Sequence, residues 1–471
     1  MKKQVLLNAF AQGLGKAITA ITSFIIVKII TSISTELYGQ YLTAYEYLAF
    51  FGIIADSGLF AIAIREMTKK PENTEHIMGN ILSMRLILIT VITAIAGITA
   101  QFIGSYPDIV QTGIWITGLS MALTIVAGTL ASVLQARMKI YWFTGALVLG
   151  KILLAGIIFW LFKHPEILQD SLYPLLWAGV ASNILFCVLV IIFARREVRL
   201  TLGTDFAWWK HIFKIAIPYG VALILQTLYL RIDVVLISIM LGMRDTALYG
   251  GATRVLESFL VLGTFFGQAF LPEVSRNNTS NDSIGKSLSW AIIMVSILAL
   301  PVIIGISAFS TDIVLLLATP DLITNATQTG SDTIMLVLIG TVLFAYLNQL
   351  FTFTLVSQNR QNYLLFVNAF ALGLNAGLNI LFLKEYGIIA AAWSTIICEI
   401  IVCGFLIREI KDKFNLSFNT KNILILFSAN TLLFSMVYLT PLKNTFILAA
   451  VLGSISYGTI ILLFRKSLMN S

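Results

Sequence analysis

Long apolar runs alternate with short polar connections along the whole chain. A bilayer-spanning helix needs roughly 20 mostly apolar residues, and fourteen runs are long enough. The predicted spans lie near residues 9–33, 40–64, 82–104, 112–135, 142–162, 172–194, 213–242, 247–272, 287–309, 333–356, 363–383, 387–407, 422–440 and 445–464. No connection is long enough to hold a separate folded domain. The pattern predicts an all-α polytopic membrane protein with about fourteen transmembrane helices.

Composition supports this prediction. Of the 471 residues, 58% are hydrophobic and only 11% are charged, whereas about a quarter of the residues in a soluble protein are charged. The cysteines Cys187, Cys398 and Cys403 fall inside apolar runs and form no ligand or disulfide pattern. We expect them to be packing residues.

Lysine and arginine are distributed unevenly between the two sets of connections. If the N-terminus is cytoplasmic, most of the 31 basic residues fall in cytoplasmic connections, and only Lys163, Arg244, Lys384 and Lys443 fall in the opposite ones. By the positive-inside rule, this bias predicts a multi-pass protein of the cell membrane with both termini in the cytoplasm. It also explains the net charge of +8 without a nucleic-acid partner.

One basic connection also carries aromatic residues. Residues 195–212 read RREVRLTLGTDFAWWKHI, with Trp208 and Trp209 beside the basic positions. Basic and aromatic residues in one short segment are typical of a helix that lies in the membrane interface. We therefore predict a cytoplasmic amphipathic linker over 195–212.

Residues 35–65 resemble residues 246–276. Seven of the 31 positions are identical at an offset of 211, where composition predicts about two: Thr35, Leu37, Tyr38, Gly39, Glu46, Gly52 and Arg65 match Thr246, Leu248, Tyr249, Gly250, Glu257, Gly263 and Arg276. The alternative is chance recurrence of common residues, but glutamate and arginine are rare in this chain. An even number of spans separates the copies, which predicts lobes related by an axis along the membrane normal, as in many transporters. The predicted domains are six-helix lobes over 1–194 and 213–410, followed by two additional helices within 411–471.

Nine charged residues are predicted to lie within the spans. The acids are Glu46, Asp56, Asp233, Glu257 and Glu399, and the bases are Lys28, Lys151, Arg231 and Arg254. Each charge at the centre of a span costs about 2.5–3.5 kcal/mol. Each of them therefore needs a partner, a water-filled cavity or the interface.

Depth along the spans suggests partners for some of these charges. Lys28 and Glu46 lie about 8–9 Å below the outer ends of adjacent helices, from the ~1.5 Å rise per residue, so they are placed to pair. Alternatively, Lys28 extends its amine to the outer interface. Lys151, near the middle of its span, is a stronger cavity candidate, and Glu399 is its acidic counterpart late in the chain.

The seventh and eighth spans carry charges at similar depths. Arg231 and Asp233 are two residues apart and must point differently, whereas Arg254 and Glu257 share one helix face. These four residues either form a structural ion-pair network between the two helices, or the arginines face a cavity. In a cavity, guanidinium groups suit the geometry of a phosphate.

The eleventh span carries three asparagines on one face, Asn368, Asn375 and Asn379. Uncharged polar residues in spans usually mediate helix packing, and we favour that interpretation over cavity lining.

Sequence signals for catalysis are weak. The chain has no phosphate-binding loop, and SNDSIGKS at residues 280–287 has Ser280 where the first glycine of that motif belongs. His76, His164 and His211 are scattered in connections without metal-site spacing. We predict no enzyme activity and no cofactor, with Na+ or H+ as the candidate coupling ion.

Several motifs resemble one known family. ELYGQY and DSGLFAIAIREMTKK, then RIDVVLISIMLGMRDTALYGGATRVLE, then LNAGLNILFLKEYGIIAAAWSTIICE are similar to the polysaccharide biosynthesis or oligosaccharide flippase family, within the multidrug/oligosaccharidyl-lipid/polysaccharide exporter superfamily. The resemblance implies two facing six-helix lobes with two appended helices. It also implies a saccharide on a polyprenyl (pyro)phosphate, moved from the inner to the outer leaflet by alternating access. By helix position it assigns Lys28 and Arg254 to the cavity, although the second helix carries the acids Glu46 and Asp56 where related flippases carry a base.

The first hypothesis is therefore a lipid-linked oligosaccharide flippase. Arg231, Arg254, Lys28 and Lys151 would contact the phosphate, and Glu46, Asp233 and Glu257 would orient them or carry coupling cations. Its expected partners are the polyprenyl-linked saccharide, membrane lipids and glycan-assembly proteins, and the expected state is a monomer. The alternatives are a cation-coupled multidrug exporter of the same superfamily and, third, a membrane-embedded glycan polymerase or transferase.

Overall fold

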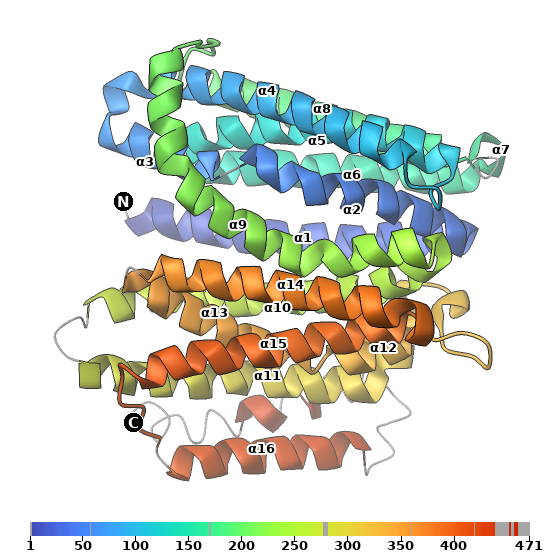
Figure 1. The fold of residues 1–471 in the computed structure, drawn as a ribbon, viewed down its shortest axis with the longest axis vertical. Helices are drawn as coiled ribbons and strands as arrows, with labels where there is room; N and C mark the ends of the chain where they lie inside the picture. Colours follow the sequence, from blue (N-terminus) through green and yellow to red (C-terminus); the bar gives the residue numbers. More distant parts are fainter. Residues whose placement is uncertain are drawn as a thin grey trace. The chain divides into compact units, whose positions relative to one another are not determined.

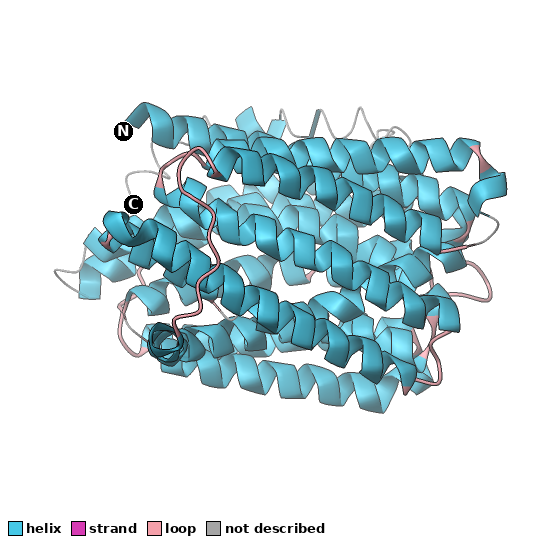
Figure 2. Cartoon of the chain, turned by 90° about the horizontal axis from the view of Figure 1, so that it is seen from above, coloured by secondary structure: helices cyan, strands magenta, loops and turns pink. Residues whose placement is uncertain are grey.

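The computed structural model describes residues 2–56, 58–168, 171–276, 281–358, 360–418, 420–438, 452–453 and 456–459. Throughout these residues the chain forms helices joined by short connections (Figures 1 and 2), apart from one isolated bridge between Asn325 and Gln328. The predicted all-α class is confirmed.

By its contacts the chain divides into two compact units, Met1–Ala247 and Leu248–Ser471. The first unit contains α1 (Lys2–Ile33), α2 (Thr35–Asp56), α3 (Leu59–Lys69), η1 (Pro71–Asn73), α4 (Thr74–Gln101), α5 (Asp108–Ala136), α6 (Ile140–Lys163), α7 (Pro165–Leu168), α8 (Tyr173–Ala194) and α9 (Phe206–Met240). Helix α10 (Met243–Arg276) begins in the first unit and continues in the second. The others are α11 (Asn281–Leu317), η2 (Pro320–Leu322), α12 (Ser331–Leu338), α13 (Thr341–Ser357), α14 (Gln361–Tyr386), α15 (Ile388–Lys411) and α16 (Thr420–Tyr438).

In the first unit, α5 packs against α4 and α8, α6 packs against α1 and α8, and α2 contacts α4, α5 and α9. Small residues allow close approach. A side chain at Gly39 of α2 would overlap the backbone carbonyl of Met243, which is how close helix packing is achieved where lipid supplies no hydrophobic driving force. Helix α9 belongs to the first unit because it packs against α2.

In the second unit, α15 packs against α12, α13 and α14, while α11 packs against α12, α13 and α16. Helix α11 is bent at Phe309, which has non-helical dihedral angles, and it contains Pro301. The buried side chains of α11 and α16 form one apolar cluster around Ala429 and Leu433.

Eight helices in the described part of the chain are long and apolar enough to cross a bilayer, or nine if the bent pair α12–α13 forms one span. They correspond to the predicted spans near 9–33, 82–104, 112–135, 142–162, 172–194, 287–309, 363–383 and 387–407, with 333–356 as the bent pair. Helices α2, α9 and α10 are not among them, and these helices carry Glu46, Arg231, Asp233, Arg254 and Glu257. The count of fourteen stays a prediction.

Several element boundaries differ from the predictions. The span predicted over 40–64 is two helices, α2 and α3, separated at Gly58, which has a positive φ of 72°. The span predicted over 333–356 is bent by 43° between α12 and α13. The linker predicted over 195–212 ends earlier, because α9 already begins at Phe206. Most of the span predicted over 445–464 lies outside the described residues.

The two compact units do not coincide with the predicted six-helix lobes, because they are defined differently. The units follow packing, and α9 packs against α2, whereas the lobes follow the internal sequence repeat. The lobe boundaries therefore stay a prediction.

Candidate functional site

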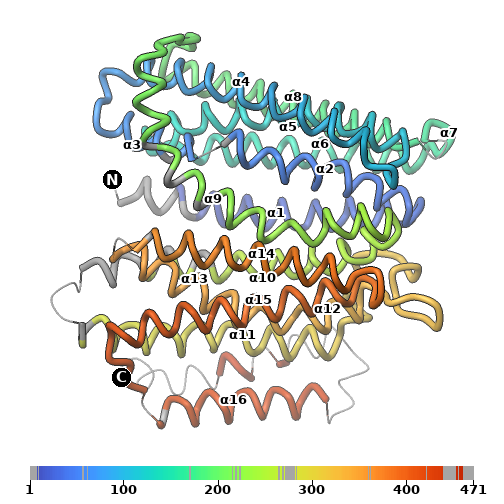
Figure 3. The backbone as a smooth tube through the Cα atoms, viewed as in Figure 1, coloured from blue at the N-terminus to red at the C-terminus, as the bar shows by residue number. Residues whose placement is uncertain are grey.

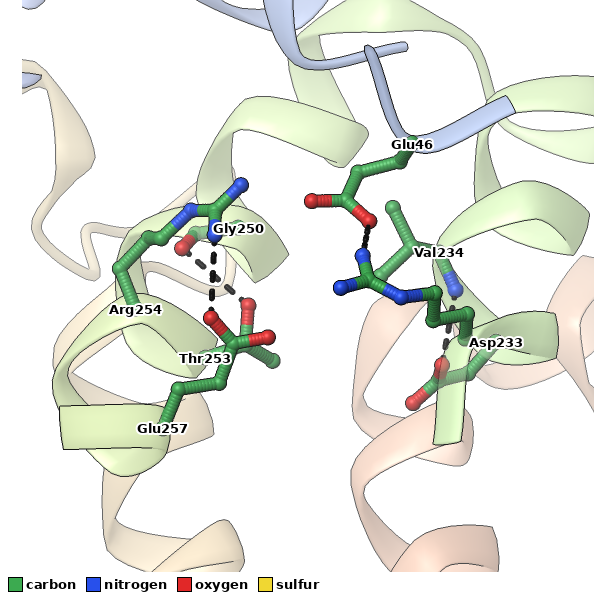
Figure 4. A network of polar contacts seen from close by, with 8 residues as sticks. Glu46, Asp233, Val234, Gly250, Thr253, Arg254 and Glu257 are labelled. Atoms are coloured by element: carbon green, nitrogen blue, oxygen red, sulfur yellow. Dashed lines mark hydrogen bonds and ion pairs between the residues drawn. The ribbon is translucent and has the colours of Figure 1, made fainter. Parts of the chain in front are cut away.

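Glu46 of α2 is paired with Arg231 of α9. The Glu46 carboxylate accepts a hydrogen bond from an Nη atom of Arg231 (Figure 4). The Glu46 side chain is 8% exposed and that of Arg231 is 32% exposed. A carboxylate removed from water in this way is stable only with a counter-charge, and a guanidinium satisfies both its charge and its lone pairs. The pair joins the middle of α2 to the C-terminal half of α9.

Asp233, two residues after Arg231, is oriented differently. Its carboxylate accepts a hydrogen bond from the backbone N–H of Val234 at 2.9 Å, and the residue is buried (Figure 4). The two side chains point in different directions, as expected for positions two apart on a helix.

Arg254 and Glu257 form a second pair within α10. An Nη atom of Arg254 lies 3.0 Å from a carboxylate oxygen of Glu257, and the side chains are 32% and 50% exposed (Figure 4). The spacing of three residues places both on one helix face. Unlike Glu46, Glu257 keeps half of its surface accessible, so this pair is open to a ligand or solvent.

The structure shows an ion-pair partner that the estimated depths of the residues along their spans did not identify. Sequence reasoning placed Lys28 near Glu46, and the structure adds Arg231 as a partner of that carboxylate. The pair Arg231–Glu46 connects α9 with α2, whereas the pair Arg254–Glu257 lies within α10. Lys28 on α1 and Lys151 on α6 are both half-buried. Their role at a cavity stays a prediction.

Glu399 of α15 is buried in a polar contact with α13. The amide nitrogen of Asn348 donates to the Glu399 carboxylate at 2.6 Å and to its backbone carbonyl at 3.0 Å. Sequence reasoning missed Asn348, because a single asparagine in an apolar run carries no periodic signal. This contact ties the two helices together.

The asparagine face of α14 is partly buried. The Asn379 amide donates to the backbone carbonyl of Asn375 at 2.9 Å, and both residues are buried, whereas Asn368 is half-buried. Burial of two of the three is consistent with a packing role. Asp56 is the last residue of α2, and its side chain lies outside the described part of the structure.

Equivalent positions of the sequence repeat have similar environments at the start of the motif. Tyr38 and Tyr249 are both fully buried. A side chain at Gly52 would overlap Met121, and one at Gly263 would overlap the ring of Tyr346. The repeated glutamates differ, because Glu46 is buried and Glu257 is exposed.

Among the described residues, no group of three or more histidine, cysteine or acidic side chains is placed to hold a metal ion. The three cysteines are buried and form no disulfide within the described part of the chain. The interactions that these charged residues show are ion pairs between an arginine and a glutamate.

Comparison with known proteins places the chain in a family. The family model described as polysaccharide biosynthesis protein matches residues 32–321. No curated protein sequence matches the chain.

Solved structures share the fold across nearly the whole chain. The lipid II flippase MurJ in an inward closed conformation has a TM-score of 0.78 at 16% identity, covering 98% of this chain and 99% of that one. An inward-facing multidrug resistance MATE transporter has a TM-score of 0.61 at 13% identity, covering 84% of this chain and 95% of that one.

A transporter of the MOP superfamily from Pyrococcus furiosus has a TM-score of 0.57 at 13% identity, covering 87% of this chain and 96% of that one. All three structures are named for transport rather than for a reaction. The protein is a multi-pass membrane protein with the fold of MOP flippases and transporters, and it belongs to the polysaccharide biosynthesis protein family.

Proposed function

We propose that the protein moves a saccharide linked to a polyprenyl (pyro)phosphate from the inner to the outer leaflet. The observation that carries the proposal is the state of Arg231 and Arg254. Each is about one-third exposed and already holds a carboxylate. A guanidinium that binds a carboxylate through charge-assisted hydrogen bonds binds a phosphate with the same donors. The family match over residues 32–321 supports a saccharide cargo.

Exchange of partners suggests how a coupling ion acts. When a phosphate takes the place of Glu46 on Arg231, the buried Glu46 carboxylate loses a counter-charge. A buried carboxylate that loses part of its compensating positive charge binds a cation more readily, so Glu46 then takes up H+ or Na+. The ion returns to water when Arg231 reverts to Glu46. In this scheme Lys28 and Lys151 add positive charge to the path of the phosphate, and Asp233 and Glu257 orient the arginines.

The decisive experiment is complementation of a strain that lacks the gene. We expect Arg254→Ala to abolish surface-glycan export while the protein level in the membrane stays normal. Arg65→Ala is the matched control, because Arg65 is exposed and bound to its neighbour Glu66 at 2.9 Å, so that variant should export normally. Normal glycan export with Arg254→Ala would remove Arg254 from the mechanism.

The runner-up function is a cation-coupled multidrug exporter, favoured by the fold shared with the MATE transporter. In that case Glu46, Asp233 and Glu257 would bind a cationic drug directly. Comparing the deletion strain's drug susceptibility with its glycan profile separates the two functions. A glycan polymerase or transferase would instead change the mass of the saccharide in proteoliposomes, whereas a flippase leaves it unchanged.

Orientation and partners complete the proposal. By the positive-inside rule, the basic connections favour termini in the cytoplasm, and we expect the cargo to be loaded from the cytoplasmic leaflet. The polypeptide works as a monomer and receives its cargo from the proteins that assemble the glycan.

A further inference from the structure

The connection between α8 and α9 is fastened to the start of α4. Asn80 of α4 is buried, and its side-chain oxygen accepts hydrogen bonds from the backbone N–H of Asp205 and from the indole N–H of Trp209, both at 2.8 Å. The tube of this connection can be followed to the first turn of α9 in Figure 3. One buried amide thus holds both the end of the loop and the beginning of the next helix.

Two glycines bring the loop close to α4. A side chain at Gly79 would lie 2.6 Å from the backbone oxygen of Thr201, and one at Gly203 would lie 2.5 Å from the Asn80 amide. Asp205 caps α9 by accepting the Trp208 N–H at 3.0 Å, and its other oxygen lies 3.3 Å from the ring of His76. These contacts give the loop a defined conformation against α4.

This fixed loop and the first turn of α9 expose large apolar side chains. Leu202 is 67% exposed and Phe206 is 72% exposed, although Trp208 and Trp209 beside them are half-buried. Exposed apolar side chains of this size next to basic positions are typical of a segment that lies in the membrane interface.

The same segment has an excess of positive charge. Five cations on it are exposed and form no ion pair with a carboxylate in the described part of the chain: Arg195, Arg196, Arg199, Lys210 and Lys214. The two acids of the segment are already engaged, Glu197 by Lys139 at 2.6 Å and Asp205 by His76. The cations are left for an external anion.

Depth places the segment at the headgroups. Helix α8 has 22 residues and ends at Ala194, a length of about 33 Å at ~1.5 Å per residue. That length is close to the roughly 30 Å hydrocarbon core. Arg195 therefore follows directly on the last turn of a bilayer-length helix, where lipid phosphates lie.

We propose that residues 195–214 form a docking surface for anionic phospholipid headgroups, here called the linker surface. Its cations bind the phosphates, and Leu202 and Phe206 enter the boundary between headgroups and acyl chains. An acidic protein would also match the charge, but two exposed apolar side chains beside the cations at headgroup depth favour lipid. Because Asn80 fixes the loop in advance, little conformational entropy is lost on binding.

The test measures lipid retained by the purified full-length protein, without any transport assay. The protein is exposed in detergent to equal amounts of phosphatidylglycerol and phosphatidylcholine, and bound lipids are counted by native mass spectrometry. We expect wild type to retain phosphatidylglycerol preferentially, and increasing salt to reduce that preference. The triple variant Arg195→Gln, Arg196→Gln, Arg199→Gln should lose about five-fold in preference per cation removed.

The matched control removes the same number of exposed cations from the second unit, with Lys286→Gln, Arg408→Gln and Lys411→Gln. It should keep the wild-type preference. The pair Leu202→Ser and Phe206→Ser should lower phosphatidylglycerol retention, whereas Leu424→Ser and Phe427→Ser, exposed on α16, should not. Thermal melting confirms that each variant is folded.

Two outcomes would overturn the proposal. One is unchanged phosphatidylglycerol preference in the folded triple variant. The other is an equal loss in the control triple, which would show that net charge alone governs lipid retention. Neither outcome bears on whether the protein moves a lipid-linked saccharide, so the two proposals fail separately.

Discussion

Glu46 and Arg231 illustrate what a charge requires inside a membrane helix. The glutamate is buried, and the arginine reaches it from a helix far along the chain while keeping a third of its own surface exposed. Removing one member of a buried ion pair is more damaging than removing both, because the remaining charge is left in a low-dielectric environment. We therefore expect the loss of either side chain alone to lower the free energy of unfolding.

We expect Glu46→Gln to destabilise the protein by about 1–3 kcal/mol. This is below the ~3–5 kcal/mol of a fully buried pair, because water screens the exposed part of Arg231. The double variant Glu46→Gln, Arg231→Met should recover much of the loss. Thermal or denaturant melting in detergent measures all three variants. Equal stability of Glu46→Gln and wild type would mean that the pair contributes nothing to stability.

At the scale of elements, close contacts between helices depend on glycine, which has no side chain. Gly39 of α2 meets the backbone carbonyl of Met243, which cannot move aside as a side chain would. We expect Gly39→Ala to cost about 1–3 kcal/mol through overpacking. Gly128→Ala in α5 is the control, since a side chain there meets nothing within 4 Å and alanine favours a helix by about 0.5–1 kcal/mol. Opposite shifts in melting temperature are expected, and a neutral Gly39→Ala would contradict the tight contact.

The start of α9 should respond to acid. The Trp208 backbone N–H donated to Asp205 lowers the pKa of that carboxyl, and His76 lowers it further. A lowered folded-state pKa stabilises the fold above the unfolded value of about 3.9, and this contribution disappears as the pH falls through the folded value. Wild type should therefore exceed Asp205→Asn in melting temperature at pH 7, and the difference should shrink as the pH falls below the unfolded value of about 3.9. A difference independent of pH would show that the charge of Asp205 does not contribute to stability.

At the scale of the whole molecule, topology can be tested by labelling. Thr204 and Ala326 are exposed in connections that the positive-inside rule assigns to opposite sides. In intact cells, a membrane-impermeant maleimide should label Ala326→Cys but not Thr204→Cys. Wild type provides the background, because its three cysteines are buried. Labelling of Thr204→Cys from outside would reverse the proposed orientation.

Sequence reasoning anticipated the elements better than their contacts. Apolar runs predicted the helices, since length and hydropathy act locally. The break between α2 and α3 at Gly58 was not predicted, because a single glycine in an apolar run does not indicate a left-handed backbone conformation. Arg231 as the partner of Glu46 was missed because it depends on α9 packing against α2, 185 positions apart. The Asn80 contacts to the linker were missed for the same reason.

The length of α9 has a further consequence. Its 35 residues extend about 52 Å at ~1.5 Å per residue, against a hydrocarbon core of roughly 30 Å. Figure 1 shows that α9 is bent, so its first turns do not run parallel to the rest of the helix. The length in excess of the core, about 20 Å, suits the headgroup region at the start of the helix, where Trp208 and Trp209 lie. The length and the bend of α9 thus favour contact of its first turns with the bilayer surface, whatever cargo the protein carries.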